Sequence, residues 1–175
     1  LFINYLIAER GVSPLTLKAY RYDLQLFAAY ICDDGCAHEA ASVENRDIRG
    51  FVDYMFDQKS SRATMERRIS ALRSFFGFLV RRDYIRIDPT EGVIYPKKEK
   101  TIPHFLYLQQ VETICSFETE ELPDIRDRAL LELFYSTGAR VAEIAGAKLS
   151  DLNLKDGTLK VLGKGHKERF VFLTP

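Results

Sequence analysis

A proline-bounded basic segment, PKKEKTIP at residues 96–103, separates two stretches of sequence that have different apolar patterns. Proline fixes φ and has no backbone N–H group to donate, so two prolines around three lysines argue against a buried helix or strand. The segment favours an extended, semi-rigid basic linker. It therefore predicts a first domain over residues 1–95 and a second domain over residues 104–175.

The first domain shows the 3.6-residue apolar period of amphipathic helices, and we expect four of them. Ser13 and Pro14 are the N-cap and first-turn residues that typically start a helix. The apolar stripe of that helix is Leu17, Tyr20, Leu24, Ala28 and Ile31. A helix over residues 48–56 follows, with apolar positions Ile48, Phe51, Val52 and Met55. The stripes predict one helical core.

The helix predicted over residues 61–82 carries core residues on one face and candidate contact residues on the other. The apolar face is Met65, Ile69, Leu72, Phe76 and Leu79. The opposite face is Ala63, Arg67, Ser70, Ser74 and Arg81. Small side chains let a helix approach a partner closely, and arginine suits phosphates and guanine edges. This face is a candidate DNA contact, with an ordinary solvated face as the alternative.

Charge is balanced over the whole chain but not along it. The 25 Lys and Arg match 25 Asp and Glu, which argues weakly against a nucleic-acid partner. Between Lys59 and Lys100, however, eleven Lys and Arg stand against five Asp and Glu. Phosphate binding requires a local basic surface of this kind, even on a neutral protein.

The second domain begins with helices and then changes to the two-residue period of strands. We expect a short helix over 109–115 and a longer one over 123–135, which the Thr137-Gly138 pair ends. The residues expected to be buried on the longer helix are Ile125, Ala129, Leu130, Leu133 and Phe134. A short helix over 140–147 precedes a strand at Leu152 and Leu154, a hairpin at Asp156-Gly157, and two further strands that end near Leu173.

Arg140 and Lys164 are the residues of the second domain most suggestive of chemistry. Arg140 stands at the start of a helix, whereas cations are usually favoured at helix C-termini, and the exposed N–H groups there add to an anion site. Glu143 lies one turn later and can orient Arg140, although an exposed ion pair of little consequence is the alternative. Lys164 stands between two glycines at a turn, which leaves it free to reach, but the run is not a phosphate-binding Walker A loop.

Several classes of protein are disfavoured by what the sequence contains. No apolar run approaches the length that crosses a bilayer, and the start lacks the basic region of a signal peptide. Three cysteines do not form an even disulfide framework, which fits a reducing cytoplasm. Cys32, Cys36 and His38 lack a fourth ligand at metal-site spacing, so we expect no metal and no cofactor. The first residue is Leu, so we expect a longer parent protein.

Taken in order, the motifs resemble the tyrosine recombinases of the λ-integrase family, in particular those of the Xer type. The motifs are SPLTLKAYRYDL, RRISALRSFFGFLVRRDYIRIDPTEGVIYPK, RDRALLELFYSTGARVAEIAGAKLSDLNL and LKVLGKGHKERFVFL. The resemblance covers essentially the whole chain. It implies a mainly α fold, with a four-helix SAM-like core-binding domain followed by the α+β start of a catalytic domain. That start comprises helices and a three-stranded antiparallel sheet.

The resemblance implies a reaction in which a tyrosine attacks a DNA phosphate and forms a 3′-phosphotyrosyl link. Arg140 matches the first arginine that neutralises charge on the phosphate, Lys164 matches the general acid for the leaving 5′-oxygen, and Glu143 matches a supporting acid. The family's His-x-x-Arg box and its nucleophilic tyrosine have no counterpart after Lys164. We therefore expect this chain to bind DNA without cleaving it. Tyr135, the tyrosine nearest Arg140 in the sequence, is interpreted as a packing residue.

The resemblance also implies a clamp around double-stranded DNA, with the linker crossing the backbone. The expected DNA contacts are Lys18, Arg21, Arg62, Arg67, Arg73, Lys97, Lys98, Lys167 and Arg169. Family members assemble as DNA-bound tetramers of recombinase subunits, whereas we expect this chain by itself to be a cytoplasmic monomer without membrane contact.

Three alternatives remain open at the level of sequence. The first is a non-catalytic, sequence-specific DNA-binding regulator. The second is a phage, transposon or integron integrase of the same family rather than a chromosome-dimer resolvase. The third is a helical interaction module with no DNA role, which the basic region and the retained Arg140 and Lys164 disfavour. The sequence identifies neither the target DNA site nor the partner recombinase.

Overall fold

The structure is a computed structural model, and it describes residues 1–32, 39–95, 102–116, 121–163, 165 and 167–173. The chain forms two compact units, Leu1–Thr101 and Ile102–Pro175. The division falls within the segment expected to be a linker. Lys97 and Lys98 of that segment lie outside the described residues, as do Cys36 and His38 of the cysteine motif.

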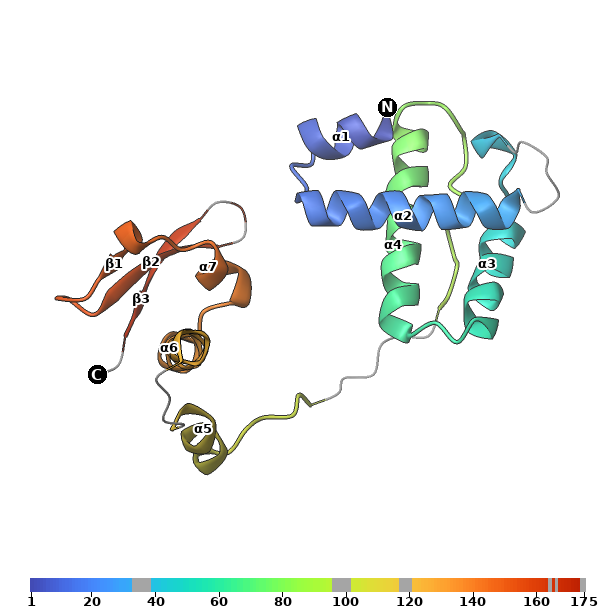
Figure 1. Ribbon diagram of the computed structural model, residues 1–175. Helices are drawn as coiled ribbons and strands as arrows, with labels where there is room; N and C mark the ends of the chain where they lie inside the picture. The colour runs from blue at the N-terminus through green and yellow to red at the C-terminus, as the bar shows by residue number, and fades with distance from the viewer. Residues whose placement is uncertain (33–38, 96–101, 117–120, 164, 166, 174–175) are drawn as a thin grey trace. The chain divides into compact units, whose positions relative to one another are not determined.

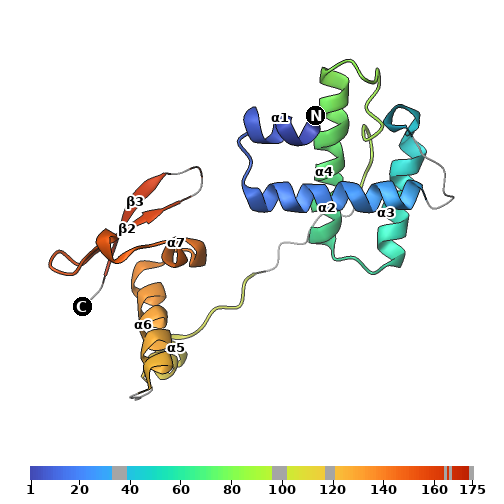
Figure 2. The ribbon, with the colours of Figure 1, turned by 45° about the horizontal axis from the view of Figure 1, so that its top comes forward.

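The described part of the first unit is helical, with four α-helices and a short 3-10 helix (Figure 1). The elements are α1 Phe2–Ala8, α2 Pro14–Ile31, η1 Ala40–Ser42, α3 Asn45–Asp57 and α4 Arg62–Arg81. In both ribbon views α2 lies across α4, with α3 beside them (Figures 1 and 2). The four-helix expectation is confirmed.

Serine caps set the starts of the two crossing helices. The Ser13 hydroxyl accepts a hydrogen bond from the Thr16 backbone N at 3.2 Å, and Ser61 does the same for Thr64 at 3.2 Å. Each cap satisfies a backbone donor that the first helical turn leaves without a carbonyl partner. The sequence pattern Ser-x-x-Thr therefore fixes where α2 and α4 begin.

The core of the first unit is built on the apolar face of α4. The residues predicted for that face, Met65, Ile69, Leu72, Phe76 and Leu79, are all buried. The expected stripe on α2 is partly wrong, because Ala28 is exposed while Asp23 and Phe27 are the buried residues of that helix. The helix is turned so that Phe27 packs into the core.

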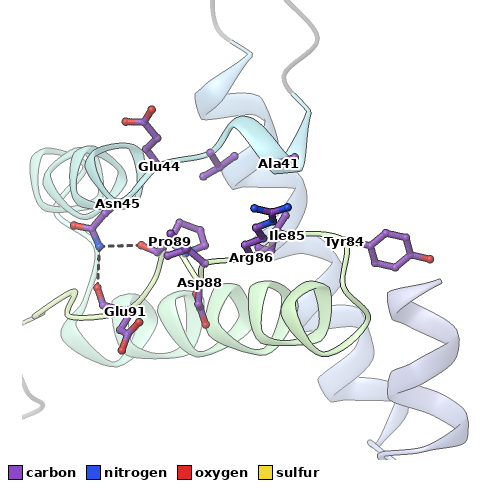
Figure 3. Close-up of a pocket in the computed structure, with 11 residues that line it drawn as sticks. Ala41, Glu44, Asn45, Tyr84, Ile85, Arg86, Asp88, Pro89 and Glu91 are labelled. Carbon is purple, nitrogen blue, oxygen red and sulfur yellow. Dashed lines mark hydrogen bonds between the residues drawn. The ribbon is translucent and has the colours of Figure 1, made fainter.

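The segment after α4 folds back onto the helices and leaves a shallow pocket beside η1 and α3. The Asn45 side chain donates hydrogen bonds of 2.9 Å to the carbonyls of Pro89 and Glu91, as Figure 3 shows. Arg73 of α4 donates to the Val93 carbonyl at 2.9 Å and lies 5.2 Å over the Tyr95 ring. Residues 89–95 are therefore an integral part of the first unit.

The described part of the second unit combines helices with a small antiparallel sheet. Its elements are α5 Leu108–Cys115, α6 Leu122–Thr137, α7 Val141–Ala145, η2 Leu149–Asp151, β1 Leu152–Asn153, β2 Thr158–Leu162 and β3 Glu168–Phe172. The strand order is β1-β2-β3, and Leu159 pairs with Val171 while Val161 pairs with Arg169. The α+β expectation, with three antiparallel strands, is confirmed.

The core of the second unit is small, and the burial predicted for α6 is largely wrong. The buried apolar residues are Ala139, Ile144, Leu159, Val161 and Val171, with Leu133 and Phe134 packed partly against them. The expected core residues Ile125, Ala129 and Leu130 are instead exposed. Tyr135 is 60% exposed, so its interpretation as a packing residue is also wrong.

The first strand is shorter than expected. Leu154 is 78% exposed and lies beyond the end of β1, because Asn153 and Asp156 exchange hydrogen bonds that close the turn earlier. None of the helices in the described ranges is both long and apolar enough to cross a membrane.

Candidate functional site

The tight turn between α6 and α7 sets the position of Arg140. Gly138 ends α6 in the left-handed region at φ 58°, where glycine is favoured, and its backbone N donates to the Phe134 carbonyl at 2.9 Å. Ala139 is then buried, and Arg140 becomes the N-cap of α7. The turn predicted from Thr137-Gly138 therefore brings Arg140 to the start of a new helix.

Glu143 is a buried carboxylate that binds both Arg140 and an arginine from β3. Its Oε1 accepts a hydrogen bond from Arg140 Nη1 at 2.9 Å. Its Oε2 accepts one from the Arg140 backbone N at 2.8 Å and one from Arg169 Nη2 at 2.9 Å. The Glu143 side chain is 3% exposed, so the ordinary surface ion pair considered as an alternative is excluded.

These contacts hold Glu143 in its charged form. The hydrogen bond from Arg169, followed by those from Arg140, lowers the pKa of Glu143 from 4.5 to about 2, although burial opposes the shift. Hydrogen bonds donated to a carboxylate favour the ionised state. Glu143 therefore remains a fixed negative charge at neutral pH and orients the guanidinium of Arg140.

Arg169 reaches Glu143 because of the alternation of β3. In the antiparallel register Arg169 lies opposite the buried Val161, and it shares a face of the sheet with the buried Val171. It was expected to be a DNA contact. Its side chain is 45% exposed, and its observed partner is Glu143. The two-residue period between Arg169 and Val171 is the sequence signal that could have predicted this contact.

The turn between β2 and β3 begins directly against Glu143. A Cβ atom at Gly163 would lie 3.3 Å from Glu143 Oε1 and 3.4 Å from the Lys167 carbonyl oxygen. The Gly163 backbone N also donates to that Lys167 carbonyl at 2.8 Å. Glycine therefore permits a close approach of this turn to the carboxylate. Lys164, the next residue in the sequence, lies outside the described residues.

The arginine of this site with the most freedom to contact a ligand is Arg140. Its side chain is 74% exposed although one nitrogen is held by Glu143. A guanidinium has five N–H donors in a planar fork, so donors remain for an oxyanion. Chemically, the arrangement can bind and polarise a phosphate group without a metal ion.

The candidate DNA contacts of the first unit have varied surroundings. Lys18, Arg21 and Arg62 are exposed on α2 and α4. Arg67 is paired with the buried Asp23, and Arg73 binds the Val93 carbonyl. Lys167 of the second unit is exposed. Neither internal partner was foreseen, and DNA contact by these residues stays a prediction.

The described residues hold no group of three or more His, Cys, Asp or Glu that could bind a metal ion. Cys32 is partly buried and carries a free thiol, while Cys36 and His38 fall outside the described ranges.

Two family descriptions match the sequence in chain order. "Phage integrase, N-terminal SAM-like domain" matches residues 1–83, and "Phage integrase family" matches residues 104–174. The segment left between the two matches contains the proline-bounded basic stretch. The two matches thus correspond to the helical unit and to the unit that carries Arg140.

Two curated proteins with similar sequences carry the same name. "Tyrosine recombinase XerC" of Oceanobacillus iheyensis is 40% identical over 173 residues, and that of Staphylococcus carnosus is 40% identical over 176 residues. Each alignment includes 97% of this chain, but only 56% and 57% of the respective relative. The chain therefore spans a little over half the length of these relatives.

Solved structures share the fold. A λ integrase tetramer bound to a Holliday junction matches with a TM-score of 0.72 and 19% identity, over 97% of this chain and 48% of that one. The Tn1549 transposon integrase in complex with circular intermediate DNA matches with a TM-score of 0.69 and 18% identity, over 99% and 59%. The family matches and the XerC relatives show that the chain belongs to the tyrosine recombinases of the phage integrase family.

Proposed function

We propose that this chain binds double-stranded DNA and supplies the first part of the active site of a site-specific recombinase. The observation that carries the proposal is the fixed cluster of Arg140, Glu143 and Arg169, which leaves the Arg140 guanidinium open to an oxyanion. The relatives are named tyrosine recombinases, and similar solved structures contain DNA, which supports the same conclusion.

In the proposed reaction, a tyrosine hydroxyl forms a bond to a DNA phosphorus and the bond to the 5′-oxygen breaks. Arg140 stabilises the charge that develops on a non-bridging oxygen, because its guanidinium is held in place before the reaction begins. Lys164 donates a proton to the departing 5′-oxygen. A 3′-phosphotyrosyl link conserves the energy of the phosphodiester, so the strands can be rejoined in an exchanged arrangement.

We infer that none of the tyrosines in this 175-residue chain is the nucleophile of this reaction. All nine tyrosines precede Lys164 in the sequence, and Tyr135 is an exposed residue of α6 rather than part of the Arg140 cluster. We propose that the chain alone binds DNA as a cytoplasmic monomer and forms no covalent adduct. The complete reaction, in a recombinase of the relatives' length, takes place in a DNA-bound tetramer and serves chromosome-dimer resolution.

The first experiment measures affinity for a short duplex of mixed sequence by fluorescence anisotropy over a range of salt concentrations. Because phosphate contacts release counterions, the logarithm of the affinity should fall linearly with the logarithm of salt. An affinity unchanged between low and moderate salt would exclude the proposed DNA clamp. A denaturing gel of the same mixture should show no protein–DNA adduct.

A DNA-binding regulator without catalytic activity is the second candidate, and it would use the exposed Lys18, Arg21 and Arg62 of α2 and α4 without needing the Arg140 cluster. Sequencing the gene beyond the codon for Pro175 distinguishes the two. A frame that continues into a His-x-x-Arg box and a tyrosine supports the recombinase. A stop codon at that point supports the regulator, for which Arg140→Ala should leave DNA affinity intact.

A further inference from the structure

A fully buried carboxylate lies at the crossing of α2 and α4, far in sequence from the Arg140 cluster. Asp23 of α2 has no exposed surface, and its Oδ2 accepts a hydrogen bond from Arg67 Nη1 of α4. Its Oδ1 lies 3.8 Å from Arg68 Nε. No described residue donates a hydrogen bond to Oδ1, and none accepts one from Arg68 Nε. The carboxylate is therefore only partly satisfied.

Such a group is a poor way to stabilise a helix crossing. Removing a carboxylate from water costs free energy that an ion pair returns only when the remaining lone pairs are also satisfied. Burial accordingly raises the pKa of Asp23, although the Arg67 hydrogen bond lowers it. An apolar side chain would pack among the surrounding core residues without this cost. Asp23 therefore calls for a role other than packing.

The arginine that Asp23 holds extends from the buried acid to the surface. The Arg67 side chain is 40% exposed, whereas that of Arg68 is 14% exposed and donates to Ser60 Oγ at 3.2 Å. The positions above and below Arg67 on its stripe of α4 carry the small side chains Ala63, Ser70 and Ser74. The α4 side chains nearest Arg67 on this stripe are therefore too small to limit access to its guanidinium.

The charges of this cluster do not cancel. Asp23 contributes one negative charge, while Arg67 and Arg68 contribute one positive charge each. The surplus is positive, and Arg67 is the arginine that reaches the surface. An anion placed there would meet a guanidinium whose orientation is already fixed by a charge-assisted hydrogen bond.

We propose that Asp23 is a positioning residue that holds the Arg67 guanidinium at the α2–α4 crossing as a contact for a DNA backbone phosphate. The inference rests on the proposed DNA binding and deepens it. Arg67 is then a pre-oriented contact, and its internal partner supports this role. Asp23 itself does not touch DNA.

The direction of one affinity change tests the proposal. Asp23→Asn in the full chain removes a negative charge and keeps the size of the side chain. If Asp23 only neutralised Arg67, the variant would bind a short duplex of mixed sequence more tightly, because the protein becomes more positive. If Asp23 positions Arg67, the variant should bind about five- to tenfold more weakly, because the oriented phosphate contact is lost. Tighter or unchanged binding overturns the proposal.

A matched control uses the exposed pair of Glu9 and Arg82, in which Arg82 directly follows α4. Glu9→Gln makes the same change of charge beside an arginine, and it should leave affinity unchanged or raise it slightly. The salt dependence of binding adds a second measurement, which does not change when part of the protein is unfolded. The slope of log affinity against log salt should fall by about one in Asp23→Asn, as expected for one lost phosphate contact.

A second variant decides the matter if Asp23→Asn does not fold. Arg67→Lys keeps the charge and the acid but removes the planar fork, so it should weaken binding by about threefold or more, whereas Arg82→Lys should not. Equal affinity of the Arg67→Lys chain and the unmodified chain overturns the inference. If the unmodified chain does not bind the duplex, the proposed DNA binding fails as well. If the chain binds the duplex but substitutions of Asp23 and Arg67 do not change its affinity, the inference is overturned and the proposed DNA binding still holds.

Discussion

Among the described residues, each unit buries a carboxylate beside a pair of arginines, and the two carboxylates respond in opposite ways. Burial raises the pKa of Asp23 in the first unit, while hydrogen bonds lower the pKa of Glu143 in the second to about 2. The difference lies in how many hydrogen bonds each carboxylate accepts, and not in the number of nearby arginines. Both Glu143 oxygens accept hydrogen bonds, one of them from a backbone N–H, whereas only Oδ2 of Asp23 has a described donor.

The comparison shows that counting arginines near an acid does not predict its behaviour. Asp23 has no exposed surface, so desolvation dominates. Glu143 lies at the edge of a small core, where its arginines still reach water. The burial of Asp23 therefore costs the first unit stability. Glu143, by contrast, is stabilised by the hydrogen bonds from Arg140 at the turn and from Arg169 of β3.

The largest expected effect comes from removing the acid of the first unit. Asp23→Ala leaves the largely buried Arg68 without its counter-charge and should lower the free energy of unfolding by about 3 kcal/mol. Glu143→Ala should destabilise the second unit less, because Arg140 and Arg169 can turn to solvent. Urea unfolding, with amide exchange resolved for α4 and α7, measures both. A larger loss in the second unit would contradict the comparison.

A smaller expected effect is that Glu143 and Asp23 make the stability of their units depend on pH in opposite directions. The pKa of Glu143 is lower in the folded state than its ordinary 4.5, so its stabilisation is present above pH 4.5 and is lost as pH falls toward 2. The pKa of Asp23 is higher than its ordinary 3.8, so stability decreases as pH rises above 3.8.

Unfolding measured across this pH range isolates the two contributions when Glu143→Gln and Asp23→Asn serve as references. The slope removed by the first substitution should have the opposite sign to the slope removed by the second. Carboxyl carbon shifts in an NMR titration give the two pKa values directly. Slopes of the same sign would show that both acids are governed by the same physical cause.

The turn next to Glu143 gives a third, more local test. Gly163→Ala places a methyl group 3.3 Å from Glu143 Oε1, which is a tight contact. The substitution should lower the free energy of unfolding by about 1 kcal/mol, because the neighbouring atoms must shift slightly. The displaced carboxylate should also show a pKa raised from about 2 toward 4.5. Lys167→Ala, an exposed change in the same turn, is the control. An unchanged Glu143 titration in Gly163→Ala would show that the turn does not constrain the carboxylate.

The smallest effect should come from an exposed pair of the same chemistry. Arg128 Nε donates to Glu132 Oε1 at 2.9 Å one turn along α6, and both side chains are about half exposed. Arg128→Ala should change the free energy of unfolding by less than about 0.5 kcal/mol. Thermal unfolding in low salt measures it. If Arg128→Ala lowered the free energy of unfolding as much as Asp23→Ala, burial would not explain the difference between the Asp23 and Glu132 ion pairs.

The sequence predicted the helices and the hairpin well, because local signals determine them. Ser13 caps its helix as expected, and the apolar period of α4 identified its buried face correctly. Burial on α6 was not predictable in the same way. Whether Ile125 or Leu130 is covered depends on a partner element, and a helical period only says which residues share a face.

The site was predicted in part. Arg140 and Glu143 are paired as the sequence spacing allowed, but the contacts of Arg169 with Glu143 and of Arg67 with Asp23 were not predicted. From hydrophobicity alone, the face of β3 that carries Phe170 and Phe172 would be expected to point into the core. These two residues are instead exposed, and Arg169 lies on the opposite, inward face of the strand. Asp23 lies between Tyr20 and Phe27 on one side of α2, and that placement was the available signal. A lone acid on a helix is nevertheless usually solvated.

The anchoring of residues 89–95 determines how the first unit responds to tension. Asn45 holds the carbonyls of Pro89 and Glu91, and Arg73 holds that of Val93 while stacking on Tyr95. A pull on the chain at Tyr95 is therefore met first by side chains of α3 and α4, before any load reaches the end of α4 at Arg81. The two helices share that load. Tension on the chain leaving the first unit is thus transmitted to the body of α4, the helix that carries Arg67.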